Sequence, residues 1–184
     1  MHTFREMIDG MFSRFCPPLL QLLNNYPKRH VASGNKNVIK GFLNIFDCHL
    51  KIFNDSWAKG KSEQELKPVL EGIFFYSCIW SIGGICDRLL GSMFNTLFYQ
   101  LLEGKLSAEV KQQFHLTVDI PDSKAPYSLP VPKQADVFSY RLSIHNKAEW
   151  SKWEDALDGS ASLPRDIYAG NMIVPTIETI RQVI

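Results

Sequence analysis

Residues 72–86 have the sequence Gly72-Ile-Phe-Phe-Tyr-Ser-Cys-Ile-Trp-Ser-Ile-Gly-Gly-Ile-Cys86. The stretch holds no acid or base apart from one tyrosine and two thiols, and Glu71 and Asp87 flank it. A helix that crosses a bilayer needs about 20 apolar residues, so this run is too short and ends in carboxylates. We therefore predict a helix that is buried in a protein core, in preference to a membrane span.

Composition places the chain among globular proteins. Of its 184 residues, 45% are hydrophobic and 21% are charged, and the formal net charge is +1. Such a balance gives no basic surface for nucleic acid or an anionic membrane, so we expect neither as a partner. The four cysteines, at positions 16, 48, 78 and 86, show no CxxC or zinc-ligand spacing. Free thiols favour a reducing, cytoplasmic location.

The first 115 residues show helical spacing of apolar side chains. Residues 3–25 predict two short helices joined at Cys16-Pro17-Pro18, because proline suits the first turn of a new helix. Asn35 is a candidate N-cap for a helix that runs to about Phe53. The mainly helical fold class rests on this pattern and on the three helices that follow.

Those three helices have recognisable start signals. Ser62 and Glu65 fit a capping box, and Pro68 means that the helix either starts nearer Leu66 or bends at the proline. We predict the next helix from Ser92 to a stop at Gly104, and a last short one from Ser107 to Phe114.

The pattern changes at His115. Prolines at 121, 126, 130 and 132 predict an extended connector, and residues 137–144 alternate as a strand does. Residues 172–174 predict another short strand, and Thr176 is a candidate cap for a final helix. The apolar face of that helix is cut off at Ile184, so we expect the natural chain to continue.

No catalytic motif is present in the sequence. It contains no GxxxxGK[ST], GxGxxG, HExxH or GxSxG pattern. Cys48 and His49 are adjacent on a helix and point in different directions, so they cannot act as a nucleophile–base pair, and we expect His49 to be a packed or rim residue. Trp150 and Trp153 are consistent with a ligand platform, but local packing is the better interpretation.

Three motifs in this order resemble the dynein heavy chain, an ATP-driven microtubule motor of the AAA+ class. The first is Phe75-Tyr-Ser-Cys-Ile-Trp-Ser-Ile-Gly-Gly84, which is similar to the helix that ends the second AAA+ module. The second is Val137-Phe-Ser-Tyr140 followed by Trp150-Ser-Lys-Trp153, and the third is Ile173-Val-Pro-Thr-Ile-Glu-Thr-Ile-Arg181. The residues of the first motif favour the axonemal class of dyneins.

The resemblance implies a division of the chain into three parts. Residues 1–115 would be the helical small (lid) subdomain of the second AAA+ module, and residues 116–135 a proline-rich connector. Residues 136–184 would be the first strands and first helix of the third module, a short α/β segment. The implied function is a structural and coupling segment of the motor ring, in a ciliary or flagellar axoneme of the cytoskeleton. A free-standing cytosolic helical module for protein interaction is the alternative.

The resemblance also implies where a nucleotide would lie. Val174, Pro175 and Thr176 match the segment on the adenine side of the third-module site. The phosphate loops would lie outside residues 1–184, so we expect no bound cofactor and no ATP hydrolysis from this part alone. The parent motor would use ATP or ADP with Mg. Its implied partners are the rest of the heavy-chain AAA+ ring and microtubules.

Overall fold

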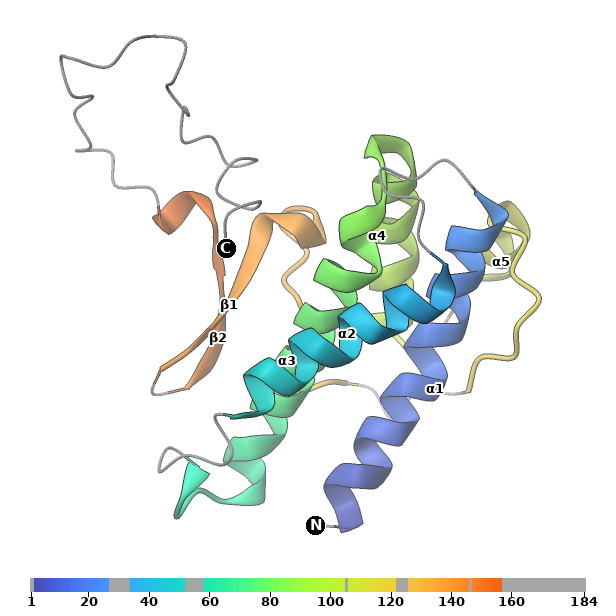
Figure 1. The fold of residues 1–184 in the computed structure, drawn as a ribbon. Helices are drawn as coiled ribbons and strands as arrows, with labels where there is room; N and C mark the ends of the chain where they lie inside the picture. Colours follow the sequence, from blue (N-terminus) through green and yellow to red (C-terminus); the bar gives the residue numbers. More distant parts are fainter. Residues whose placement is uncertain are drawn as a thin grey trace, which may run out of the picture.

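The computed structural model describes residues 2–26, 34–51, 58–104, 106–121, 126–145 and 147–156. This part of the chain is mainly helical and carries one antiparallel pair of strands, which confirms the predicted fold class. Figure 1 shows the helices packed together, with the strand pair to one side. The helices are α1 (His2–Asn25), α2 (Asn35–Leu50), α3 (Glu63–Ser81), α4 (Arg88–Leu102) and α5 (Ala108–Gln113). The strands are β1 (Tyr140–Ile144) and β2 (Ala148–Lys152), and the 3-10 turns are η3 (Gly83–Ile85), η4 (Val137–Ser139) and η5 (Glu154–Ala156).

Helix α3 is the centre of the fold. It contacts α1, α2 and both strands, and Phe75, Ile79 and Ile82 are fully buried. By length and composition alone, the segment Glu63–Ile85 could cross a membrane, but 72% of its most apolar window is buried inside the protein. The prediction of a core helix is therefore confirmed.

Helix α1 is continuous, so the prediction of two helices joined at Pro17-Pro18 is wrong. Each proline removes one helical hydrogen bond and costs about 3 kcal/mol. The apolar side chains on both sides of the prolines compensate for that loss, because each fully buried one contributes about 1.5–3 kcal/mol. Phe15, Leu19 and Leu22 are all 0% exposed in one core, and that core needs them on a single helix.

Two other helices begin at residues that the sequence did not predict. Gly34, not Asn35, is the N-cap of α2, and the helix ends at Leu50; Phe53 lies outside the described residues. Helix α4 begins at Arg88 instead of Ser92, because the Asp87 carboxylate accepts a hydrogen bond from the backbone N–H of residue 90.

The capping predictions for α3 and α5 are confirmed. Glu65 accepts hydrogen bonds from the backbone N–H and the hydroxyl of Ser62, both at 2.8 Å. The alternative start near Leu66 is wrong, and Pro68 lies inside the helix. Ser107 caps α5 by accepting from the backbone N–H of residue 110.

The strand pair begins three residues later than predicted. Residues 137–139 form η4, because the Asp136 side chain accepts from the Phe138 N–H and closes a turn there. The antiparallel register pairs Tyr140 with Lys152 and Leu142 with Trp150. The buried core extends past the helices into the connector and this strand pair, through Leu116, Val131, Val137 and Tyr140.

Candidate functional site

The connector is held to the helices by side chains that bond to its backbone. Residues 126–153 and their contacts with α3 and α4 are called the joint below. Glu71 of α3 is 1% exposed, and its Oε2 accepts hydrogen bonds from the N–H groups of Ser128 at 2.5 Å and Leu129 at 3.0 Å. Burial raises the pKa of the Glu71 carboxyl, whereas the two N–H groups and the charge of Lys67 lower it. The net pKa shift is upward.

Helix α4 makes the second set of these contacts. The Tyr99 hydroxyl lies 2.6 Å from the carbonyl oxygen of Pro132 and 2.8 Å from that of Ala135, so its one proton is shared between two acceptors. Burial raises the pKa of Tyr99 well above its ordinary value. Asn95 accepts a hydrogen bond from the backbone N–H of Val137 at 2.9 Å. Tyr99 therefore fixes the end of the connector, and Asn95 fixes the first residue of η4.

A glycine in α3 allows the strand pair to approach the helix closely. A Cβ atom at Gly72 would lie 2.9 Å from both Leu129 Cδ2 and Leu142 Cδ1. These two leucines, one from the connector and one from β1, occupy the space that a side chain would take. Trp150 of β2 adds a hydrogen bond from its indole Nε1 to the Leu129 carbonyl oxygen at 3.2 Å.

A second glycine does the same at the other end of the joint. A Cβ atom at Gly83 would lie 2.9 Å from Cε1 of Phe138 and 2.9 Å from Cε1 of Phe94. Phe94 is fully buried in α4, and the ring of Phe138 from η4 stacks obliquely on it with centroids 5.7 Å apart. Gly83 thus lets the aromatic ring of Phe138 enter between α3 and α4.

The tryptophans of the sequence meet at this joint. Trp153 is 4% exposed, and its indole donates to the Tyr140 carbonyl oxygen at 3.1 Å, which confirms the interpretation as local packing. Trp80 packs edge-on against Trp153 with ring centroids 5.8 Å apart, and against Phe138 at 6.3 Å. Trp80 is partly exposed and lies at the edge of the core, under the strand pair.

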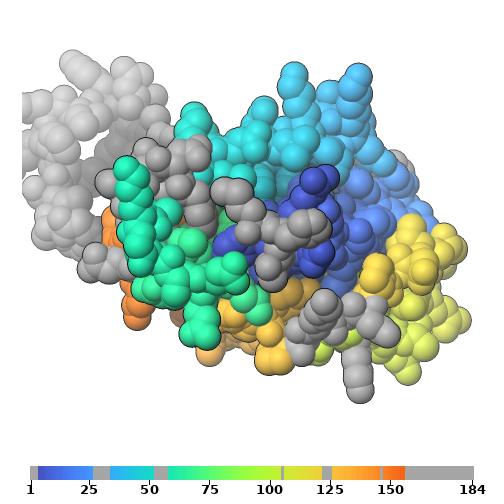
Figure 2. All heavy atoms as spheres, turned by 90° about the horizontal axis from the view of Figure 1, so that it is seen from below, coloured from blue at the N-terminus to red at the C-terminus, as the bar shows by residue number. Residues whose placement is uncertain are grey.

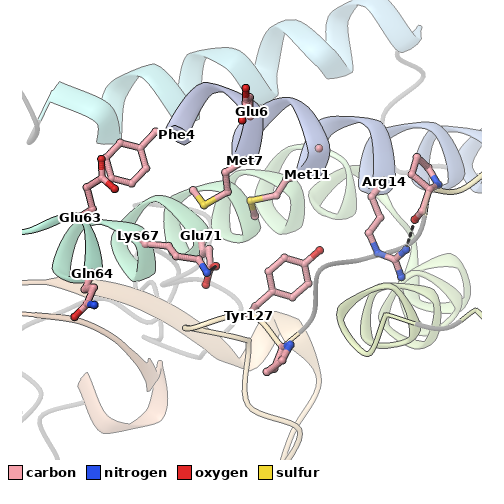
Figure 3. A pocket seen from close by; sticks show the side chains of 13 residues that line it. Phe4, Glu6, Met7, Met11, Arg14, Glu63, Gln64, Lys67, Glu71 and Tyr127 are labelled. Atoms are coloured by element: carbon pink, nitrogen blue, oxygen red, sulfur yellow. Dashed lines mark hydrogen bonds and ion pairs between the residues drawn. The ribbon is translucent and has the colours of Figure 1, made fainter. Parts of the chain in front are cut away.

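A groove of about 440 Å³ opens beside the joint, between the first half of α1, the start of α3 and the connector. Figure 2 shows this end of the molecule, and Figure 3 shows the side chains that line the groove. Met7 and Met11 lie on the α1 side, and the ring of Tyr127 comes from the connector. Buried Arg14 donates to the Leu101 carbonyl oxygen at 3.0 Å and to the carbonyl oxygen of Pro121, so it ties α1 to α4 and to the start of the connector.

The contacts at the joint are packing and hydrogen bonds between parts of this chain. Among the described residues, no three His, Cys, Asp or Glu side chains form a metal-binding group. His49 packs on Tyr76 with ring centroids 5.1 Å apart, and its Nδ1 lies 2.9 Å from the Ile45 carbonyl oxygen, as expected for a rim residue. The candidate nucleotide contacts at 174–176 lie outside the described residues.

The sequence did not reveal Glu71, Tyr99 and Asn95 as residues of the joint. The one local signal was the Glu71 carboxylate, which lies at the edge of the apolar run. A buried carboxylate requires hydrogen-bond donors, so such a residue indicates a partner elsewhere in the chain. Its donors lie at positions 128 and 129, which local periodicity cannot identify.

Comparisons with known proteins agree on one family. The family model described as the dynein heavy chain AAA lid domain matches residues 8–155. Dynein axonemal heavy chain 1 of Homo sapiens is 26% identical over 200 residues, covering 98% of this chain and 4% of that protein. Dynein axonemal heavy chain 12 of Homo sapiens is 29% identical over 111 residues, covering 60% of this chain and 3% of that protein. No solved structure was found to match. The match of the family model covers most of the chain, which therefore belongs to the dynein heavy chain AAA lid domain family.

Proposed function

We propose that the protein is a structural coupling segment in the ring of an ATP-driven dynein motor that moves along microtubules. In this proposal residues 1–115 are the lid subdomain of the second AAA+ module, residues 116–135 connect it onward, and residues 136–184 begin the third module. The chain spans 3–4% of the two human relatives, both of which are named axonemal dynein heavy chains. Family membership favours this function over a free-standing module for protein interaction.

The joint is the observation that carries the proposal. Side chains of two helices bond directly to the backbone of the joint, Glu71 and Tyr99 to the connector and Asn95 to the first residue of η4. A rotation of the helical block would therefore move the strand pair with it, since packed cores and bonded interfaces shift as rigid bodies. Such a part needs stiffness and no reactive groups.

The remaining assignments follow from the same proposal. The complete motor would bind ATP or ADP with Mg, and Val174, Pro175 and Thr176 would line the adenine side of the third-module site. The partners would be the rest of the heavy-chain AAA+ ring and, through the whole motor, microtubules. The location would be the cytoskeleton of a ciliary or flagellar axoneme, within the cytoplasm. Residues 1–184 alone would not hydrolyse ATP.

Loosening the joint without unfolding the helices tests the proposal. Tyr99→Phe keeps the ring but leaves the carbonyl oxygens of Pro132 and Ala135 without their donor, a loss of about 1 kcal/mol. Tyr26→Phe is the matched control, because its hydroxyl bonds to the Gln113 carbonyl oxygen, away from the joint.

In the full heavy chain, we expect Tyr99→Phe to keep most ATP turnover but to lower microtubule gliding velocity about two- to thirtyfold, which corresponds to a coupling loss of about 0.5–2 kcal/mol. Tyr26→Phe should glide at close to the unmodified rate. Equal gliding velocities in the two variants would overturn the coupling role of the joint.

A further inference from the structure

The groove beside the joint has the size and the lining of a small-molecule site. Its volume of about 440 Å³ falls in the range of ligand pockets, about 300–1,000 Å³. Met7 and Met11 on α1 and the ring of Tyr127 from the connector supply apolar walls (Figure 3). Methionine side chains adapt their shape and make favourable contacts with aromatic rings. The groove can therefore hold an aromatic group.

One buried carboxylate oxygen in the groove lacks a hydrogen-bond donor. Glu71 lines the groove and is 1% exposed. Its Oε2 accepts both N–H groups of the connector, from Ser128 and Leu129, whereas its Oε1 accepts no hydrogen bond from any residue that the structure describes. The ammonium of Lys67 lies 3.8 Å from Oε1, too far for a hydrogen bond. Because a buried oxygen without a donor costs free energy, a ligand that supplies an N–H group there would be stabilised.

The carboxylate of Glu71 and the ammonium of Lys67 together indicate the kind of polar group that fits. Both side chains come from α3, one helical turn apart, and Figure 3 shows their end groups next to each other in the groove. A primary carboxamide has an N–H donor and a carbonyl acceptor that point to the same side. Such a group can donate to Oε1 of Glu71 and accept from Nζ of Lys67 at the same time.

The charges around the groove favour a neutral molecule. Arg14 and Lys67 are basic, and Glu6, Glu63 and Glu71 are acidic, so both signs line the groove. Lys67 and Glu71 lie close enough to balance each other. A charged ligand would place an additional charge against the apolar walls, which costs free energy.

We propose that the groove is a binding site for a small neutral aromatic carboxamide. The carboxamide would bridge Glu71 and Lys67, and the ring would lie between the methionines of α1 and Tyr127. Because the other oxygen of Glu71 holds the connector, the ligand would bond to the same carboxylate that fixes the joint. Binding would need only the groove, so it is independent of the coupling function proposed above.

Photolabelling of the full heavy chain tests the site. The probe is para-benzoylbenzamide, a neutral aromatic carboxamide that reacts with nearby C–H bonds under ultraviolet light. Its matched control is the N,N-dimethyl analogue, which has the same rings but no N–H donor. Trypsin releases the groove side of α1 as the peptide Glu6–Arg14. Mass spectrometry compares the label on this peptide with that on Leu89–Lys105, which carries Met93 of α4.

The label should follow both the carboxamide and the space in the groove. At a subsaturating concentration, we expect the probe to label Glu6–Arg14 about tenfold more than its dimethyl analogue, because the analogue loses a hydrogen bond to a charged group. Excess benzamide should compete with this label, and Leu89–Lys105 should carry little of it. Gly10→Phe should lower the label several-fold, because Gly10 lines the groove and a Cβ atom there would meet nothing within 4 Å, so a ring can fill the space. Gly10→Ala, the matched control, should be labelled like the unmodified chain.

Each contrary result would overturn the assignment of this site. Equal labelling by the two probes would show that Glu71 and Lys67 do not bind the carboxamide. Label that resists benzamide, or that is equal in Gly10→Phe and Gly10→Ala, would show that the probe binds elsewhere. An unlabelled Glu6–Arg14 peptide would show that the groove is closed or filled by polypeptide in the heavy chain. Failure of the coupling function is separate, since it appears as normal gliding in Tyr99→Phe whatever the groove binds.

Discussion

At the scale of single residues, Trp80 joins the helical core to the strand pair. The rings of Tyr76, Phe138 and Trp153 lie around it, with centroid distances of 6.1, 6.3 and 5.8 Å. We expect Trp80→Ala to lower the free energy of unfolding by about 3 kcal/mol. This value is at the low end of the range for replacing a buried tryptophan by alanine, because the side chain is partly exposed. Urea denaturation measures this loss, and Trp80→Phe should recover much of it. A loss below about 1 kcal/mol would contradict the packing described here.

Glu71 makes stability depend on pH, and the sign follows from its pKa. Burial is the largest cause of the shift and raises the pKa in the folded state, so the folded protein holds the proton more tightly than the unfolded chain. The contribution of Glu71 is therefore most favourable below the ordinary carboxyl pKa, about 4.3, and is lost as pH rises through the folded-state value.

The variant Glu71→Gln removes this titration and serves as the reference. We expect the unfolding free energy of the unmodified protein, minus that of Glu71→Gln, to decrease as pH rises from about 4 to 7. Urea titrations of both proteins across this range measure the difference. A difference that increases with pH would mean that the N–H groups of Ser128 and Leu129 outweigh burial.

At the scale of elements, the two adjacent glycines after α3 have different roles. A Cβ atom at Gly83 would lie 2.9 Å from the rings of Phe94 and Phe138, whereas one at Gly84 would meet nothing within 4 Å. We expect Gly83→Ala to destabilise the protein by about 1–3 kcal/mol, because the added methyl group would lie 2.9 Å from both rings and force a shift in the packing. Gly84→Ala, the matched control, should change stability by no more than about 0.5 kcal/mol.

Thermal unfolding separates these two variants. For a chain of this size, 1 kcal/mol corresponds to about 2–4 °C in Tm. Gly83→Ala should therefore melt several degrees below Gly84→Ala. Equal melting temperatures would show that the aromatic rings do not pack against Gly83 as closely as the structure indicates.

Local signals predicted some elements well and failed at others for physical reasons. Ser62 with Glu65, and Ser107, were predictable because a cap and its partner lie within three residues. The continuity of α1 through Pro17 was not predictable, because it depends on tertiary packing that outweighs proline's local cost. The joint was unpredictable in detail, because residue 71 meets residue 128 across 57 positions of sequence.

At the scale of the whole molecule, one core includes both helices and strands. Leu116, Val131, Val137 and Tyr140 are each no more than 8% exposed and pack in the same cluster as the helices. The change in composition at residue 115 predicts an extended connector from about that position. In the structure, the connector and the strand pair pack on α3 and α4 and cover part of their surface.

This continuity predicts how shortened chains behave. A chain of residues 1–115 loses five buried apolar side chains, the four above and Trp153, each contributing about 1.5–3 kcal/mol, together with the connector groups bonded to Glu71 and Tyr99. That total is comparable to the full stability of an ordinary domain, about 5–15 kcal/mol. We therefore expect residues 1–115 to lack a cooperative thermal transition in near-ultraviolet circular dichroism, whereas residues 1–156 should melt sharply. If residues 1–115 melted within a few degrees of residues 1–156, the helical block would be stable by itself, and the joint would be a docking contact between two independent parts.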